Sequence, residues 1–272
     1  MANEKNESKV FELLSRAESG TEITIRDDQN DFAAFLDSAR LCREKGGRFR
    51  LIDTGKFGVF ELEWLAQAGV DIYTSDEARP KKAEVELLAG ACSKGQAVVA
   101  YFYQGSIRRN KESVSAPASL LQDISQSGAY LHLSNRDGER DFSFLSESAY
   151  ACRQAGAWLV YYHYGRPAAG LKDLAGSGGW IHLSDRGFEP REDSALLLDV
   201  VKRAAAAGAG LVFHVEEAAS ASALRDVLQA GAFVLFKRPG LDYKSPLWPL
   251  QQHARRKDLD FRAYYLYTTI LP

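Results

Sequence analysis

Cysteine is scarce in this chain, and its placement excludes two common kinds of small structural module. The three cysteines, Cys42, Cys92 and Cys152, cannot all pair with one another, and none stands in a CxxC or Cys/His ligand spacing. A disulfide framework and a zinc module are therefore not indicated. Each cysteine lies three or four residues before a glycine that ends an amphipathic segment, which predicts small, buried packing residues.

Long apolar runs and an excess of one charge are also missing. No apolar stretch approaches the roughly 20 residues that a bilayer span needs, and the stretch from Met1 to Lys9 has no apolar signal-peptide core. The 34 Lys and Arg residues nearly balance the 36 Asp and Glu residues, for a formal net charge of -2. We therefore expect a soluble, cytoplasmic protein that binds neither nucleic acid nor membrane.

The sequence does contain a repeat. Residues 128–136 read GAYLHLSNR, and residues 178–186 read GGWIHLSDR. Apolar runs of about six residues alternate with amphipathic segments that end in small residues and glycine, a pattern typical of alternating strands and helices. The first set of expected strands is Thr21–Arg26, Val70–Ser75, Ala129–Ser134, Gly179–Ser184 and Ala232–Lys237. The second set, interleaved with the first, is Phe49–Asp53, Ala97–Tyr103, Trp158–Tyr164 and Leu211–Val215.

A long helix is expected after each of the first four strands of the first set. The four helices are Asp31–Lys45, Pro80–Lys94, Asp141–Ala155 and Asp193–Ala207. Asp31, Asp141 and Asp193 are expected N-caps, because a carboxylate accepts hydrogen bonds from free backbone N–H groups. Shorter helices follow the second set of strands and close at Gly69, Gly128, Gly178 and Gly231, so a βαβα unit occurs four times.

Eight successive strand–helix steps predict an α/β protein of (β/α)8, TIM-like barrel architecture. The barrel is expected over residues 21–243, after an N-terminal helical extension over residues 1–20. A C-terminal extension over residues 244–272 either covers one end of the barrel or pairs with another subunit in a homo-oligomer. The ninth strand implies that one terminal strand lies outside the barrel, and an open doubly wound sheet is the alternative fold.

Side chains alternate across a strand, so the aligned positions can be sorted by face. In the first set, aliphatic positions such as Ile23, Ile72 and Ile181 are expected to face the helices, and the positions of His132 and His182 the barrel interior. In the second set, the positions expected to point inward are Asp53, Tyr101, Tyr162 and His214, with Gly55, Tyr103, Tyr164 and Glu216 above them. A polar ligand-binding mouth would explain these hydrophilic positions, because unpaired buried polar groups cost about 1 to 3 kcal/mol.

Strand-borne histidines are the sharpest candidates for catalysis. His132, His182 and His214 are predicted to act as acid or base at the strand ends, where such barrels place their chemistry, whereas His163 is expected to face the helices. Together with Asp53 or Asp185 they also resemble a set of metal ligands, but no two histidines stand as HxH or HxxxH. We therefore expect neither a metal nor a cofactor, and structural hydrogen bonding is the alternative role of these histidines.

Other polar side chains are expected to bind the substrate or assist the histidines. Asp53 and Glu216 are the predicted carboxylate partners, and Tyr101, Tyr103, Tyr162 and Tyr164 are predicted to contact the substrate or simply to fill the interior. Arg136, Arg186 and Arg238 are expected to hold an anion, unless neighbouring carboxylates neutralise them. Lys237 is the candidate for Schiff-base chemistry. The sequence has no GxGxxG or GxxxxGK[ST] phosphate-binding motif.

Together these patterns favour an enzyme of lyase, isomerase or hydrolase type. Its ligand is expected to be a small anionic or polyhydroxylated metabolite, on which it performs acid/base chemistry. The alternative is a non-catalytic barrel that binds a ligand or a protein partner, because no compact catalytic motif is present.

Overall fold

The computed structural model describes residues 2–103, 115–135, 140–215 and 226–236. Its helices are α1 (Ala2–Glu18), α2 (Phe32–Glu44), α3 (Val59–Gln67), α4 (Lys82–Gly95), α5 (Ser115–Ser125), α6 (Phe142–Gln154), α7 (Leu171–Gly176) and α8 (Pro190–Ala206). Its strands are β1 (Ile23–Arg26), β2 (Phe49–Ile52), β3 (Asp71–Ser75), β4 (Val99–Phe102), β5 (Tyr130–Ser134), β6 (Leu159–His163), β7 (Trp180–Ser184), β8 (Leu211–Val215) and β9 (Phe233–Phe236). The C-terminal extension expected over residues 244–272 lies outside these ranges.

The nine strands form one sheet in the sequential order β1 to β9. Each pair whose register is defined is parallel, for example Leu51 with Ile72 and His182 with Val212. A doubly wound sheet reverses its strand order at a switch point, whereas here each strand neighbours the next one in the sequence. The predicted α/β class and the TIM-like succession of strands are thus confirmed.

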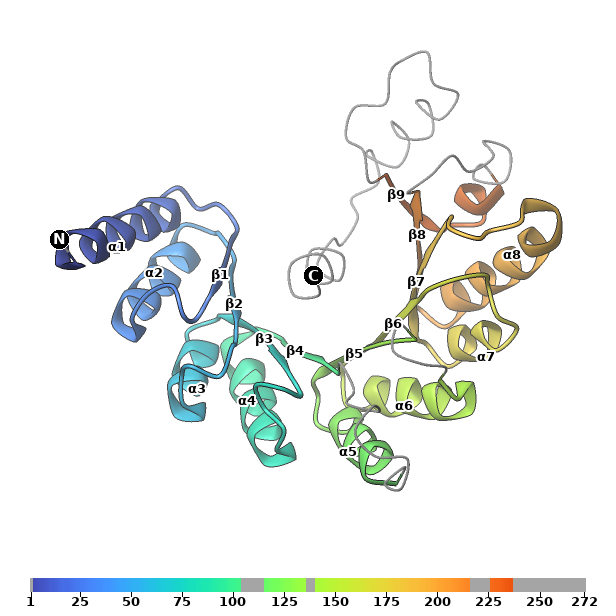
Figure 1. Cartoon of the computed structure of the whole chain (residues 1–272), viewed down its shortest axis with the longest axis horizontal. Helices are drawn as coiled ribbons and strands as arrows, with labels where there is room; N and C mark the ends of the chain where they lie inside the picture. The colour runs from blue at the N-terminus through green and yellow to red at the C-terminus, as the bar shows by residue number, and fades with distance from the viewer. Residues whose placement is uncertain (1, 104–114, 136–139, 216–225, 237–272) are drawn as a thin grey trace, which may run out of the picture. The chain divides into compact units, whose positions relative to one another are not determined.

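The chain divides into two compact units. Unit 1 comprises residues 1–106 and 112–131, and unit 2 comprises residues 107–111 and 132–272. Within unit 1, α2, α3 and α4 lie on one face of β1 to β4 (Figure 1). Within unit 2, α6, α7 and α8 likewise lie on one face of β6 to β8 (Figure 1). Each unit therefore has a helix-covered sheet face and an opposite face that no described helix covers, which we call the open face.

Aliphatic and aromatic side chains on the helix-covered face build the core. Phe49 of β2 packs edge-on against Phe35 of α2, with ring centroids 6.1 Å apart. In unit 2, Tyr161 of β6 packs against Phe142 of α6 at 6.0 Å. The three cysteines are free and buried, which confirms their expected packing role.

The predicted helix boundaries hold, with one clear exception. The Asp31 carboxylate accepts a hydrogen bond from the Ala34 N–H at 2.9 Å, and that of Asp141 accepts from the Ser143 N–H at 2.9 Å, so both are N-caps. The predicted cap at Asp193 is wrong, because α8 begins at Pro190. Proline is well suited to the first helical position, and the Asp193 carboxylate reaches back to the Glu189 N–H at 2.8 Å from inside the first turn.

A glycine with a positive φ angle begins each copy of the repeated sequence. Gly128 and Gly178 precede β5 and β7 and adopt φ values of 85° and 89°. L side chains rarely adopt this left-handed conformation, which the chain needs to turn from a helix into a strand.

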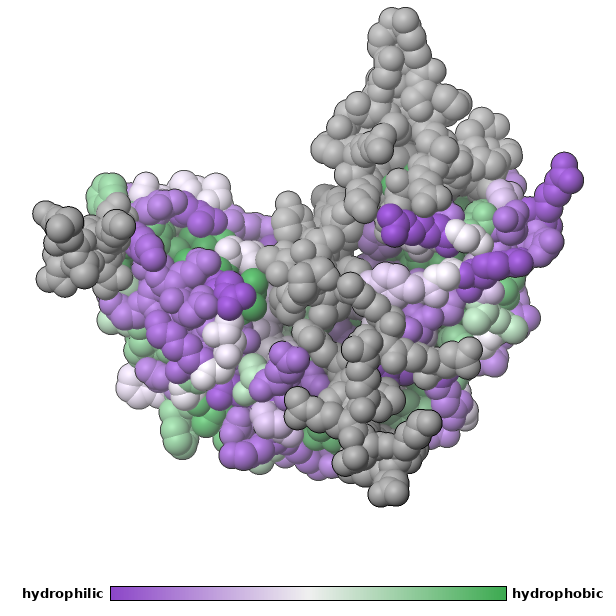
Figure 2. Space-filling view, in the orientation of Figure 1, coloured by the Kyte–Doolittle hydropathy of each residue, from purple (hydrophilic) through white to green (hydrophobic). Residues whose placement is uncertain are grey.

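The surface is mainly hydrophilic on the face that Figure 2 shows, where hydrophobic residues form separate spots. In the described ranges, no helix has the length and apolar character needed to cross a bilayer. The large hydrophobic side chains exposed on the helices include Phe11, Phe60 and Trp64.

Helix α4 offers a test of the close approach between α3 and α4. A Cβ atom added to Gly95 would lie 1.9 Å from the Ala66 carbonyl oxygen of α3, whereas one added to Gly90 of the same helix meets nothing within 4 Å. We expect Gly95→Ala to lower the free energy of unfolding by about 1 to 3 kcal/mol through overpacking. Gly90→Ala should instead raise it by about 0.5 to 1 kcal/mol, because alanine is the better helix former. Denaturant unfolding measures both, and equal effects of the two variants would contradict this account of the packing.

Candidate functional site

The open face of unit 2 gathers three histidines and a tyrosine. Tyr162 of β6 pairs in register with His182 of β7, so both side chains point to the same side of the sheet. His214 of β8 lies two residues beyond Val212, the register partner of His182, and therefore shares that side. The neighbouring positions Tyr161 and Leu183 lie on the opposite, helix-covered side. The predicted grouping of His132, Tyr162, His182 and His214 is therefore found in the structure.

Two hydrogen bonds organise this histidine cluster. Nδ1 of His132 lies 3.0 Å from the Tyr162 hydroxyl, and Nδ1 of His182 lies 2.9 Å from Nε2 of His214. The rings of Tyr162 and His182 are 4.6 Å apart between centroids, which joins the two pairs through ring contact. The four side chains therefore form a continuous series from β5 to β8.

Burial differs along the series. His132 and His182 are each 3% exposed, whereas His214 is half-buried. Nε2 of His182 is buried and has no hydrogen-bond partner among the described residues. A buried polar atom without a partner costs about 1 to 3 kcal/mol, so the structure retains an unfavourable polar group beside the most accessible histidine.

Burial also sets the charge of these imidazoles. It lowers the pKa of His132 from 6.5 to about 3. The pKa of His182 is lowered well below 6.5 by burial, and further by the neighbouring His214 and His132. Both rings are therefore neutral at pH 7, the form in which an imidazole nitrogen can accept a proton or a hydrogen bond.

Unit 1 contains a different polar cluster around Asp53, at the end of β2. Its carboxylate accepts hydrogen bonds from Arg79 Nε at 2.8 Å and Nη2 at 2.9 Å, from the Thr74 hydroxyl at 2.7 Å and from the Gly55 N–H at 2.9 Å. Arg79 also donates to the carbonyl of Phe57, and the Tyr101 hydroxyl donates to the Arg79 carbonyl at 3.3 Å. This cluster ties the loops that follow β2 and β3 to each other.

The predicted faces of Asp53 and Tyr101 are wrong. Asp53 alternates with Leu51 and Phe49, and Phe49 packs on α2, so these side chains share the helix-covered face. Tyr101 pairs in register with Thr74, and the Thr74 hydroxyl donates a hydrogen bond to Asp53. Tyr101 therefore also lies on the helix-covered face. Tyr101 and Tyr162 occupy matching positions in the sequence pattern but lie on opposite faces in the structure, because a shift of one residue between two strands exchanges the faces. By the same alternation Tyr103, two residues after Tyr101, belongs to the helix-covered side and is buried.

The other predicted site residues fall into two groups. Tyr164 is 39% exposed, and its backbone N–H and carbonyl both bond to the side-chain amide of Asn135. Arg186 is exposed, just after β7. Glu216, Arg136, Lys237 and Arg238 lie outside the described residues.

His163 faces the helices as predicted, in contact with Phe142 of α6, and its Nε2 donates to the Arg166 carbonyl at 2.7 Å.

Three arginines that follow strands are paired with neighbouring carboxylates, which is the alternative to anion binding. Arg26 pairs with Asp28, Arg79 with Asp53, and Arg166 with both Glu192 and Asp193. Neighbouring carboxylates therefore neutralise these three guanidinium groups.

Sequence reasoning missed the residues that join consecutive loops. Asp27, fully buried after β1, accepts from the Thr54 hydroxyl at 2.6 Å and from the Lys56 N–H at 3.1 Å. Asn135 holds the Tyr164 backbone from the same position after β5. The repeat carries the signal, because Asp27, Asn135 and Asp185 occupy equivalent places directly after their strands.

A metal centre finds no support in this part of the chain. Among the described residues, no group of three or more His, Cys, Asp or Glu side chains is arranged to hold an ion. The Nδ1 atoms of His132 and His182 are directed to Tyr162 and His214 instead.

Comparison with known proteins yields only distant structural likenesses. No family model matches the sequence, and no curated protein matches it. The 3-dehydroquinate dehydratase from Aquifex aeolicus VF5 is 12% identical, with 87% of this chain and 98% of that chain covered and a TM-score of 0.37. The methylaspartate ammonia lyase from Clostridium tetanomorphum is 15% identical, with 90% and 71% covered and a TM-score of 0.35. The deoxyribose phosphate aldolase from Aeropyrum pernix is 14% identical, with 85% and 93% covered and a TM-score of 0.33. Likenesses this distant determine neither activity nor substrate.

Replacing Asp53 tests whether its cluster is structural. Asp53→Ala removes the closer carboxylate from the 9%-exposed Arg79 side chain and leaves it the Glu84 carboxylate at 3.7 Å, so the loss should approach about 3 to 5 kcal/mol, the cost of removing one partner of a buried ion pair. Asp28→Ala is the matched control, because the Arg26–Asp28 pair is exposed and such pairs contribute about 0 to 1 kcal/mol. Chemical denaturation compares the two variants, and similar losses would argue against a structural role for the Asp53 cluster.

The buried His132 predicts a pH dependence of stability. Its pKa of about 3 in the folded protein lies below the ordinary 6.5, so the unfolded chain binds a proton that the native state rejects. The free energy of unfolding therefore keeps its full value above pH 6.5, and it decreases as the pH falls from 6.5 toward 3. We expect His132→Asn to reduce the loss of unfolding free energy between about pH 7 and about pH 5.5 by about 1 kcal/mol. An unchanged slope of stability against pH would refute the assignment.

Proposed function

We propose that the open face of unit 2 is the site of an enzyme that transfers a proton on a small anionic or polyhydroxylated metabolite. The reaction class is that of a lyase, isomerase or hydrolase. One observation carries the proposal, namely a 3%-exposed His182 that lies 2.9 Å from the more accessible His214. Paired imidazoles of unequal exposure suit general acid/base chemistry near neutral pH.

The two histidines have different roles in this proposal. His214 exchanges the proton with the substrate, because it is the more exposed ring. When His214 is protonated, its Nε2–H donates to the Nδ1 lone pair of His182, which fixes the orientation of the His214 ring. His182 is therefore a positioning residue, and its low pKa keeps the proton on His214.

Substrate contacts are proposed from the residues around the ends of β6 and β7. Ser184 pairs in register with His214, and Tyr164 and Arg186 follow the same strand ends with exposed side chains. Arg136, Glu216, Lys237 and Arg238 are proposed from the sequence alone. Asp53, Tyr101 and Tyr103 are assigned no role at this site, because they lie on the helix-covered side of unit 1.

A second function, non-catalytic binding of a ligand or protein partner, has one observation in its favour. His132 and His182 are as buried as core residues, and His132 has its hydrogen bond within the protein. A barrel that uses its histidines only for internal bonding would have this appearance.

A thermal-shift panel of phosphosugars, hydroxycarboxylates and polyols separates the two functions. A ligand at about 100 times its dissociation constant adds about 2.7 kcal/mol of stability, and a hit then defines the substrate for a turnover assay. We expect His214→Asn to abolish turnover while its unfolding free energy stays within about 1 kcal/mol of the parent protein.

The matched control is His163→Asn, the same change on the helix-covered face. It should lower stability but leave turnover per folded molecule unchanged. Binding without turnover would favour the non-catalytic function, and full activity of His214→Asn would exclude the proposed role of His214.

A further inference from the structure

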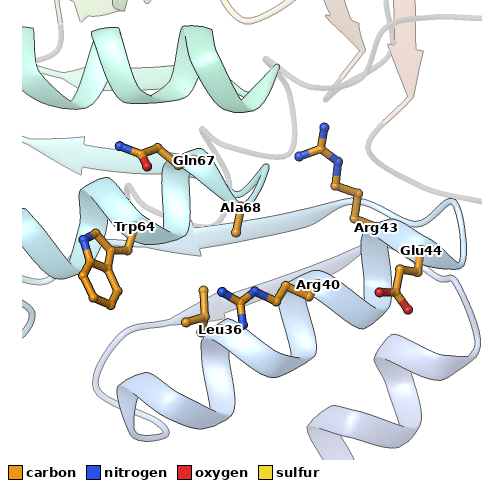
Figure 3. A pocket seen from close by; sticks show the side chains of 7 residues that line it. All are labelled: Leu36, Arg40, Arg43, Glu44, Trp64, Gln67 and Ala68. Atoms are coloured by element: carbon orange, nitrogen blue, oxygen red, sulfur yellow. The ribbon is translucent and has the colours of Figure 1, made fainter.

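A groove on unit 1 lies apart from both polar clusters. It runs between α2 and α3 and encloses about 550 Å³ (Figure 3). This volume is within the range of about 300 to 1,000 Å³ that is usual for small-molecule sites. Neither the histidine cluster nor the Asp53 cluster contributes a side chain to it.

One part of the groove is aromatic and apolar. Trp64 of α3 and Leu36 of α2 point into the space between the two helices (Figure 3), and Ala68 lines it beside them. The indole of Trp64 is 61% exposed, although it contacts Phe32 at a centroid distance of 6.3 Å. The contact with Phe32 limits the mobility of the ring and leaves much of its surface available to a flat ligand.

The same groove carries two guanidinium groups. Arg40 extends between Leu36 and Ala68 (Figure 3), and within the described chain no hydrogen bond or ion pair engages it. Arg43, one turn further along α2, makes a long hydrogen bond of 3.5 Å to Gln96. Arg40 can therefore accept an anionic partner without losing an existing one.

Among the residues that line the groove, negative charge lies at the far end. Glu44 is the one acidic residue that lines it, and it lies at the opposite end from Trp64 (Figure 3). The position beside Trp64 and Arg40 thus combines an aromatic face with a positive charge that no described side chain pairs with, a combination that suits a ring bearing an acidic group.

We propose that this groove binds a planar aromatic anion, with its ring against Trp64 and its acidic group on Arg40. The site is independent of the function proposed for unit 2. A small ligand fits the observations better than a protein partner, because the groove's volume of about 550 Å³ is that of a small-molecule site. A stable protein interface needs roughly 800 Å² on each partner.

Titration of the full chain with 2-naphthoate tests the proposal. We expect saturable one-to-one binding by isothermal titration calorimetry. Arg40→Gln and Trp64→Leu should each weaken binding at least tenfold, because the first removes the charge partner and the second removes the ring. Lys94→Gln on α4 and Phe11→Leu on α1 are the matched controls, and both should bind as the parent protein does.

Two further probes define the ligand class. Uncharged 2-naphthylmethanol and non-aromatic cyclohexanecarboxylate should each bind at least tenfold more weakly than 2-naphthoate. Equal binding of either probe, no binding of 2-naphthoate, or an unchanged affinity of Arg40→Gln would overturn the proposal. So would concentration-dependent dimerisation that Trp64→Leu abolishes, because the groove would then be an interface between copies of this chain.

His214→Asn keeps the two proposals distinguishable. It should leave 2-naphthoate binding unchanged, whatever its effect at the unit 2 site.

Discussion

The two-residue period of side chains along parallel strands is the constraint on which this structure depends. Each strand residue faces either the helices or the open face, and no intermediate position exists. In unit 2 this period brings His132, Tyr162, His182 and His214 together from four strands, so that His132 can bond to Tyr162 and His182 to His214. In unit 1 the same period turns Asp53 toward the helix side, where it fixes loops.

Burial determines what the two polar clusters can do. In unit 2, burial without a compensating charge lowers the pKa of His132 and His182 and leaves neutral imidazoles beside the half-buried His214. In unit 1, the Asp53 carboxylate is satisfied by Arg79, Thr74 and a backbone N–H, so little of its hydrogen-bonding capacity remains for a ligand. The Asp53 cluster therefore joins loops within unit 1, whereas the histidine cluster of unit 2 consists of neutral, buried rings beside one half-buried ring.

Polar residues directly after equivalent strands make equivalent hydrogen bonds. Asp27 and Asn135 follow equivalent strands, and each bonds the loop or strand end that comes next in the sheet. These bonds fix the positions where βα units most often carry function. The groove between α2 and α3 has a different origin, since it arises from two helix surfaces whose side chains are spaced by the helical period.

The sequence by itself determined the alternation of strands and helices, most helix boundaries and the grouping of the histidines, because local periodicity and turn glycines depend on neighbouring residues. Only the tertiary structure decided the faces of Asp53 and Tyr101, since a register slip of one residue is invisible in hydrophobic patterns where every position of a strand is buried. The start of α8 and the partners of Arg79 and Arg166 were likewise decided there. The arginine partners depend on contacts between residues more than 20 positions apart, and no local pattern encodes such distances, whereas the start of α8 follows from Pro190 and the bond from the Glu189 N–H to Asp193.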